Sequence, residues 1–148
     1  MKTNYKPEWN PAVSPYLMVE NVENEIAFLQ HVFAGEIIEA PKQPDGKIFH
    51  AEIRIDDSIV MIGRSQEGGP ALKGNVYVYV PSADETYQRA LEAGATNLTE
   101  PADQFYGNRQ CSFVDPSGNQ WWVAQLLGER PMTEQEITDS HPAQKDHQ

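Results

Sequence analysis

Apolar residues follow first a helical period and then strand periods in the first half of the chain. Between positions 22 and 33 they recur every three or four residues, at Val22, Ile26, Leu29 and Phe33. That spacing predicts an amphipathic helix, and Gly35 marks its end. Residues 49–55 alternate apolar and polar side chains, which is typical of a half-buried strand. With apolar segments after Pro15, at 36–40 and at 59–63, the pattern predicts one strand, a helix and three further strands.

The same order of elements returns after a linker that contains Gly and Pro. Residues 75–80 (NVYVYV) predict a strand. Ser82, with Glu85 three residues later, forms the capping-box arrangement at the start of a second helix, and Gly94 marks the end of that helix. A short strand and a hairpin around the sequence DPSG complete the set. The second half of the chain therefore repeats the first.

The two halves align at an offset of about 60 residues, which pairs Val19 with Val80 and Gly35 with Gly94. A single strand-helix-strand-strand-strand unit cannot bury both its helix and its sheet face. We therefore predict an α+β fold of two tandem βαβββ modules that form a cup-shaped mixed sheet with the helices outside. The predicted boundaries are 14–64 and 74–126 for the modules, 65–73 for the linker, 1–13 for an N-terminal extension and 127–148 for a polar tail.

Composition excludes several classes of function. The chain of 148 residues carries a net charge of −11, and its 11 basic residues are scattered, so nucleic acid is not an expected partner. No apolar run is long enough to cross a membrane, and the N-terminal residues show no signal peptide. The single cysteine, Cys111, excludes an internal disulfide. We expect a cytoplasmic protein. The acidic surface favours solubility, and it would also suit a cationic ligand.

Two motifs resemble one known family. The repeated module, together with FHAEIRIDDSIVMIG and DQFYGNRQCSFVDPSGNQWW, is similar to the vicinal-oxygen-chelate superfamily of glyoxalase I, bleomycin-resistance proteins and extradiol dioxygenases. Within it, the motifs resemble the PhnB-like branch. The resemblance covers about 14–126, a single domain. It implies an eight-stranded, cup-shaped sheet that is often completed by a homodimer in which modules pair across chains.

The resemblance also implies a place for a metal ion, with His or Glu ligands on the first and fourth strands of each module. The corresponding residues here are Ser14, Met61, Asn75 and Trp122. An indole nitrogen only donates hydrogen bonds, and a thioether prefers soft copper(I). We therefore expect no metal ion and no cofactor at these positions.

His50 and Glu52 are the candidates for acid–base chemistry. They alternate with apolar residues, so both lie on one face of the predicted strand, where they could transfer a proton or form a weak metal site. The favoured interpretation is a polar strand face whose charges pair with neighbours, with Arg54 as the partner of Glu52. Cys111 alternates with Phe113 and is interpreted as a buried structural thiol.

Aromatic residues provide the candidates for ligand binding. Tyr16, Tyr77, Tyr79 and Trp122 alternate with aliphatic residues, so we expect them to face the cup, where they could grip an apolar or aromatic ligand. The loop DQFYGNR is expected at the rim, with Phe105, Tyr106 and Arg109 able to close over a ligand. The same rings could instead fill the cup or a dimer interface. The predicted ligand-binding set is Tyr16, Met61, Asn75, Tyr77, Tyr106, Arg109 and Trp122.

Three functions follow from these observations. The leading hypothesis is a metal-independent protein that sequesters a small molecule in an aromatic cup. The second is a glyoxalase-type, metal-dependent lyase or isomerase with a shifted site at His50 and Glu52. The third is a homodimeric interaction domain whose cup is filled.

Overall fold

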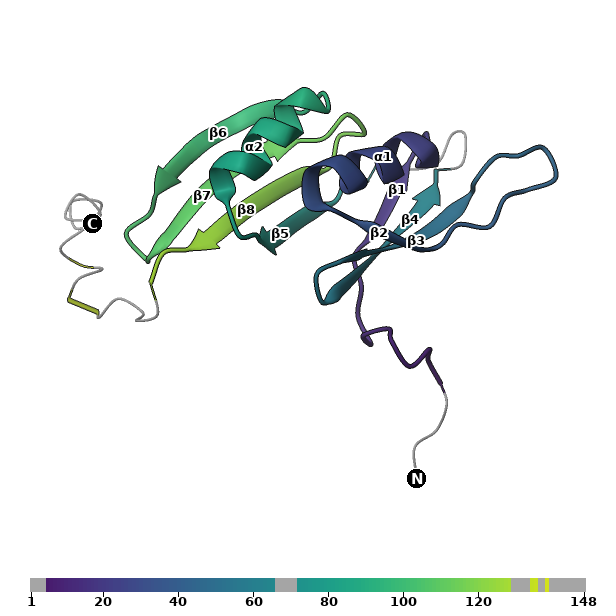
Figure 1. Ribbon diagram of the computed structural model, residues 1–148, viewed down its shortest axis with the longest axis horizontal. Coiled ribbons are helices and arrows are strands. Elements are labelled where there is room, and N and C mark those ends of the chain that lie inside the picture. The colour runs from purple at the N-terminus through teal and green to yellow at the C-terminus, as the bar shows by residue number, and fades with distance from the viewer. Residues whose placement is uncertain (1–4, 66–71, 129–133, 136–137, 139–148) are drawn as a thin grey trace.

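The computed structural model describes residues 5–65, 72–128, 134–135 and 138. The elements, in chain order, are β1 (Tyr16–Val19), α1 (Val22–Phe33), β2 (Glu36–Glu39), β3 (His50–Ile55), β4 (Ser58–Arg64), β5 (Asn75–Tyr79), α2 (Ala83–Glu92), β6 (Thr96–Asp103), β7 (Asn108–Val114) and β8 (Gln120–Leu126). The predicted α+β fold and the repeated order of elements are confirmed (Figure 1). No helix among the described residues is long and apolar enough to span a membrane. Most of the predicted linker and tail lies outside the described residues.

The strands form two four-stranded sheets, in the orders β1-β4-β3-β2 and β5-β8-β7-β6. The first strand of each module runs parallel to the fourth, and the other neighbours are antiparallel. Within the described residues, no strand of one sheet pairs with a strand of the other. The eight strands implied by the resemblance are therefore present, but as two separate sheets within one chain.

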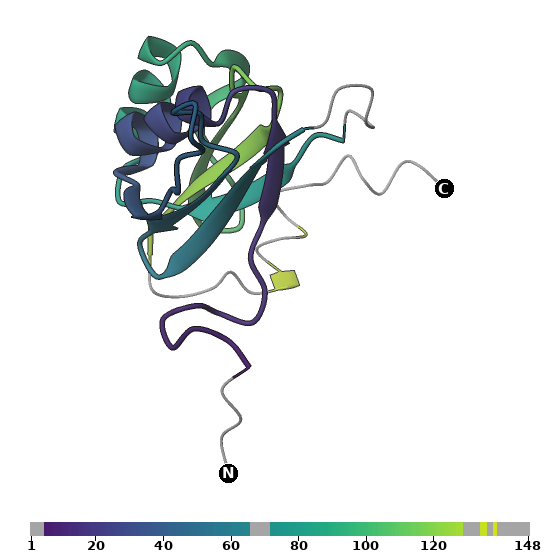
Figure 2. The same ribbon diagram turned by 90° about the vertical axis from the view of Figure 1, so that its right-hand side faces the viewer.

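Both helices lie on the same side of the two sheets (Figure 2). We call the opposite faces the open faces, because neither helix covers them. The modules share one hydrophobic core on the helix side. In that core the Phe33 ring of α1 lies 4.7 Å from the Trp121 ring of β8, between centroids, and Phe28 meets Phe113 edge to face at 6.3 Å. Aromatic packing beneath the helices therefore joins the two halves of the chain.

The two helix ends differ in how closely they follow the sequence prediction. Ser82 caps α2, because its hydroxyl accepts a hydrogen bond from the Glu85 backbone N–H at 3.2 Å, as predicted. At the end of α1 the left-handed residue is Ala34, with φ of 54°, one residue before Gly35, which was predicted to mark the end of the helix. Gly35 is required for a different reason: a Cβ there would lie 2.7 Å from Cγ2 of Ile53. It allows the chain to pass close over β3.

The strand that precedes the turn between β6 and β7 is longer than the sequence indicated. β6 extends to Asp103, two residues beyond the predicted strand at 95–101, with irregular register against β7. The turn is closed by a hydrogen bond of 2.7 Å from the Gln104 N–H to the Asn108 carbonyl oxygen. Gly107 adopts φ of 90°, a conformation that favours glycine. This turn fixes the position of Tyr106 beside the second sheet.

Candidate ligand-binding site

The open face of the second sheet carries the aromatic residues. In β5, Tyr77 and Tyr79 alternate with valines that face the helices, and Trp122 of β8 lies directly opposite Tyr77. The Tyr77 and Tyr79 rings are in edge contact, with centroids 5.5 Å apart. Their exposed fractions are 48% and 63%. The alternation in the sequence correctly predicted which side of the strand each ring occupies.

Trp122 and Asn75 are bonded to each other. The indole Nε1 of Trp122 donates a hydrogen bond of 2.6 Å to Oδ1 of Asn75. Because indole nitrogen is a donor only, the amide oxygen of Asn75 must face the ring, and its Nδ2 must point away. The bond holds the indole against β5 before any ligand arrives.

A chain of hydrogen bonds crosses the same face. Nδ2 of Asn108 donates to the Tyr77 hydroxyl at 3.3 Å, and that hydroxyl donates to Oε1 of Gln110 at 3.2 Å. The Tyr106 hydroxyl, from the turn between β6 and β7, donates to the same oxygen at 2.6 Å. Burial raises the pKa of Tyr77, which keeps its hydroxyl protonated as a donor. Tyr106, which was expected at the rim of the cup, thus reaches the sheet face.

We call this surface the aromatic face, defined by Asn75, Tyr77, Tyr79, Tyr106, Asn108, Gln110 and Trp122. Sequence reasoning missed Asn108 and Gln110, although both alternate with Cys111 and Phe113 of the core and so had to lie on the open side. Arg109, in the predicted set, lies on the other side of the strand. Its guanidinium pairs with Asp84 at 3.0 Å and Asp103 at 2.9 Å, which raises its pKa.

The open face of the first sheet is covered in part by the chain itself. Tyr16 lies over Gly63, where a Cβ would be 2.5 Å from its hydroxyl oxygen, and its ring centroid is 6.0 Å from that of His50. Met61 of β4 is half-buried. It lies opposite Tyr16 on the neighbouring strand β1 and opposite Glu52 on the neighbouring strand β3. The predicted residues of this module thus lie together on one face.

Glu52 is buried beneath the N-terminal segment. It is 8% exposed, and its Oε1 accepts a hydrogen bond of 3.1 Å from Nδ2 of Asn10, which is itself 5% exposed. Lys6 lies on the same N-terminal segment, and its Nζ donates a hydrogen bond of 2.8 Å to the backbone carbonyl oxygen of Asn10. The expected ion pair between Glu52 and Arg54 is not formed among the described residues; the partner of Glu52 is an amide.

The four positions that the resemblance gives to metal ligands do not suit a metal ion. Asn75 and Trp122 satisfy each other, and the Ser14 hydroxyl is buried without a hydrogen-bond partner in the described chain. Met61 offers a thioether. Elsewhere in the described part of the chain, no group of three or more His, Cys, Asp or Glu side chains could hold a metal ion. The donor set therefore does not fit the metal ion of the family.

Cys111 and His31 do not belong to the open faces. Cys111 is fully buried, and burial raises its pKa to about 11. Its thiol lies 3.9 Å from the Ala83 carbonyl oxygen at the start of α2. His31 is on the surface of α1, where it contacts Glu92 at 3.1 Å. The burial of Cys111 matches the interpretation made from the sequence.

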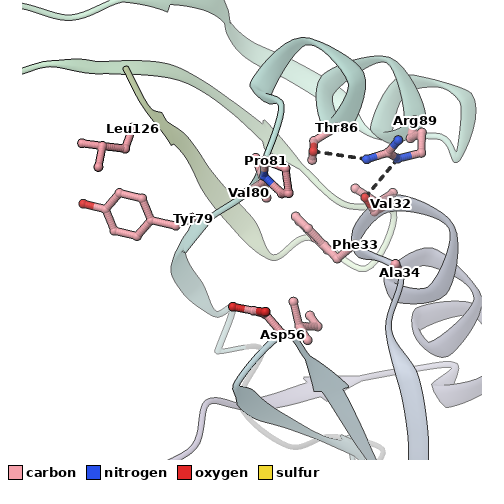
Figure 3. Close-up of a pocket in the computed structure, with 11 residues that line it drawn as sticks. Val32, Phe33, Ala34, Asp56, Tyr79, Val80, Pro81, Thr86, Arg89 and Leu126 are labelled. Atoms are coloured by element: carbon pink, nitrogen blue, oxygen red, sulfur yellow. Dashed lines mark hydrogen bonds between the residues drawn. The ribbon is translucent and has the colours of Figure 1, made fainter. Parts of the chain in front are cut away.

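A cavity of about 540 Å³ lies at the junction of the two modules (Figure 3). Its walls are mostly apolar. The end of α1, the β3–β4 turn and α2 contribute residues to them. Arg89 borders it, but donates to the Val32 carbonyl oxygen at 3.3 Å and to the Thr86 hydroxyl at 3.4 Å, so its guanidinium links the two helices. A second cavity of about 390 Å³ shares Ile55, Asp56 and Tyr79 with the first. Tyr79 therefore connects the aromatic face to the junction.

A buried carboxyl pair also joins the modules. Glu25 of α1 is 1% exposed and lies beside Asp115, at the β7–β8 turn. Asp115 accepts hydrogen bonds from the Trp121 indole at 2.9 Å and from the Asn119 backbone N–H at 2.9 Å. Burial, reinforced by Asp115, raises the pKa of Glu25 to about 9, so Glu25 is protonated at neutral pH. The pair is part of the core and not of the open face.

Comparison with known proteins agrees with this architecture. The chain belongs to the glyoxalase/bleomycin resistance protein/dioxygenase superfamily, whose family model matches residues 12–123. It is 34% identical over 135 residues to an uncharacterised protein of Mycobacterium bovis (strain ATCC BAA-935 / AF2122/97), a match that covers 84% of this chain and 89% of the relative. A Mycobacterium tuberculosis (strain ATCC 25618 / H37Rv) protein, also uncharacterised, has the same identity, with 79% of its length covered.

Solved structures share the fold. TioX from Micromonospora sp. ML1 has a TM-score of 0.69 and 25% identity, over 80% of this chain and 100% of that one. A mutant of the fosfomycin resistance protein FosX from Listeria monocytogenes, in complex with Mn(II) and 1S,2S-dihydroxypropylphosphonic acid, has a TM-score of 0.61 at 17% identity, over 88% and 97% of the two chains. The second likeness shows the fold alone.

Proposed function

We propose that the protein binds a small molecule on the aromatic face of its second module, without a metal ion. The observation that carries this proposal is the hydrogen bond between Trp122 and Asn75. Both residues stand where the resemblance would put metal ligands. Here they form a hydrogen bond with each other, and they make up one side of the aromatic face.

The aromatic face is organised before a ligand binds. Tyr77, Tyr106 and Trp122 each donate a hydrogen bond to a neighbouring side-chain amide. Ordering side chains on binding costs free energy, so rings that are already held bind more tightly than mobile ones. The Tyr79 ring, 63% exposed, is not covered by the described residues. This exposure counts against a cup that the chain itself fills.

A second copy of the chain is proposed to cover the remaining apolar surface. Tyr16 of the first module is 53% exposed, and Leu126 at the end of β8 is 63% exposed. Large apolar side chains that are exposed commonly mark an interface where they gather in a patch. Light scattering on the purified protein tests this: twice the 16.6 kDa mass of the chain supports the homodimer, and a single mass contradicts it.

The catalytic alternative at His50 and Glu52 has less support. A general acid or base must reach the substrate within hydrogen-bond distance. The carboxylate of Glu52 is instead buried under Asn10. We also propose that the chain belongs to the PhnB-like branch of the superfamily, on the strength of the two motifs that carry the resemblance.

A ligand-stabilisation screen tests the proposed function. Aromatic compounds are screened by thermal denaturation against the wild type, Trp122→Ala and Trp9→Ala. Trp9 is a matched control because it is 60% exposed on the N-terminal segment. We expect compounds that stabilise the wild type to lose that effect in Trp122→Ala and keep it in Trp9→Ala. Compounds that stabilise all three proteins equally would place the ligand elsewhere.

A further inference from the structure

The aromatic face carries no charged side chain among the described residues, in a chain whose net charge is −11. The side chains on the open face of β5, β7 and β8 are Asn75, Tyr77, Tyr79, Asn108, Gln110, Ser112, Val114, Gln120, Trp122, Ala124 and Leu126. At the edge of this face, Asp56 and Asp57 of the β3–β4 turn line a cavity together with Tyr77 and Tyr79. Arg109 with Asp84 and Asp103 lies on the helix side. A ligand on this face meets rings and neutral amides.

The hydrogen-bond acceptors of the two central amides are already in use. Oδ1 of Asn75 accepts from Trp122, and Oε1 of Gln110 accepts from both Tyr77 and Tyr106. The Tyr77 hydroxyl accepts from Asn108 and directs its own proton at Oε1 of Gln110. Nδ2 of Asn75 and Nε2 of Gln110 have no partner in the described part of the chain. Two N–H donors are therefore left for a ligand.

We infer that the ligand is an uncharged, planar aromatic molecule that carries hydrogen-bond acceptors, such as a carbonyl oxygen, for these two amides. The inference rests on the proposed function and names the class of ligand for the same face. A flat ring stacks on the exposed aromatic side chains, and its acceptor satisfies a donor that would otherwise be buried without a partner. The side chains of the face itself offer no opposite charge to replace the hydration that a charged ligand would lose there.

A cation is the main rival, because the negative chain attracts cations over long range and aromatic rings can bind them face-on. A cation and a neutral ligand with an acceptor differ in how they interact with the side-chain amides of Asn75 and Gln110. An N–H donor repels a cation and binds an acceptor. The orientation of these amides therefore separates the two possibilities.

Four bicyclic probes of similar size test the inference: N-methyl-2-quinolone (neutral, with an acceptor), N-methylquinolinium (a cation), 2-naphthoate (an anion) and indole (neutral, a donor only). Each is titrated into ¹⁵N-labelled protein, and the Trp122 indole N–H signal is followed. We expect N-methyl-2-quinolone to bind about tenfold more tightly than the other three. Tighter binding of the cation at the same signal overturns the inference and leaves the proposed function intact. No shift with any probe overturns both.

A substitution that removes the free donor, paired with a control for the charge that it adds, sharpens the test. Gln110→Glu keeps an oxygen to accept from Tyr77 and Tyr106 but replaces the N–H donor with a second oxygen. Gln88→Glu, exposed on α2, makes the same charge change on the helix side. We expect about tenfold weaker binding of N-methyl-2-quinolone to Gln110→Glu and unchanged binding to Gln88→Glu. Equal affinity in both variants would show that the Gln110 amide does not contact the ligand.

Discussion

The indole of Trp122 donates a hydrogen bond of 2.6 Å to the side-chain oxygen of Asn75, across the parallel strands β5 and β8. This contact removes two side chains from any metal site and turns them into a wall of the aromatic face. The wall consists of a half-buried ring held in one orientation and an amide whose donor is free. The function proposed for the protein follows from that pairing.

The bond between these residues should be measurable as a coupling energy. Trp122→Phe removes the donor and keeps a ring, and Asn75→Ala removes the acceptor. In a double-mutant cycle of unfolding free energies, we expect a coupling of about 0.5–1 kcal/mol, the usual net value of a partly exposed hydrogen bond. Additive effects of the two substitutions would mean that the bond does not form in solution.

Glu25 should make stability depend on pH. Its pKa rises from an ordinary value of 4.5 to about 9 in the folded protein. Between pH 4.5 and about 9, Glu25 keeps a proton in the folded state that it has lost in the unfolded state. The contribution of Glu25 to the stability of the fold is therefore complete below pH 4.5, and it declines as the pH rises to about 9. Glu25→Gln cannot lose a proton. We expect its stability relative to the wild type to rise by about 1.4 kcal/mol per pH unit across this window.

Glu23 on the same helix provides a control with the opposite sign. The backbone N–H of Ile48 donates to its carboxylate at 2.9 Å and lowers its pKa. A lowered pKa means that stability is lost as the pH falls, so Glu23→Gln should differ from the wild type most at neutral pH and least in acid. Urea unfolding of the three proteins at several pH values measures both trends. A Glu25→Gln profile parallel to the wild type would show that Glu25 is ionised in the core.

Cys111 should be inert to thiol reagents while the protein is folded. The side chain is fully buried, and burial raises its pKa to about 11, so almost no thiolate exists at mildly alkaline pH. We expect labelling by a chromogenic disulfide reagent to follow the unfolded fraction as urea is added. Rapid labelling in native buffer would contradict the buried position of Cys111.

Asn10 should contribute to stability through Glu52. Asn10→Ala leaves a buried carboxylate without its amide partner, which we expect to cost about 1–2 kcal/mol in unfolding free energy. Trp9→Ala, one residue away and exposed, should change stability by about 0.5 kcal/mol or less. Chemical denaturation compares the two variants. Equal losses would indicate that the segment acts through general packing and not through the bond to Glu52.

Much of the site could be predicted from alternation along strands. That rule placed Tyr77 and Trp122 on the open face because each has aliphatic or core neighbours on either side. It could also have found Gln110, which alternates with Cys111 in the same way. It could not give the bond from Tyr106 to Gln110, because this contact depends on the conformation of the turn that contains Gly107.

The contacts between the two halves of the chain were harder to predict. Glu25 lies three residues after Val22 and four before Leu29, so the helical period put it on the inner face, but a carboxyl group there is unexpected without the neighbouring Asp115. Asn10 belongs to a segment with no apolar period, and only the three-dimensional structure brings it to Glu52. Burial of polar groups depends on partners that are distant in sequence.

The most direct test of metal-independent binding on the aromatic face is a titration of N-methyl-2-quinolone into ¹⁵N-labelled protein, carried out once after dialysis against EDTA and once with excess Mn(II), Zn(II) or Ni(II). Binding is followed by heat of mixing where the metal broadens the spectra. We predict that the Trp122 indole signal shifts in the EDTA-treated protein and that the affinity is the same with each metal. Binding that appears only with a metal ion, or that leaves the Trp122 signal unmoved, would contradict metal-independent binding at this face.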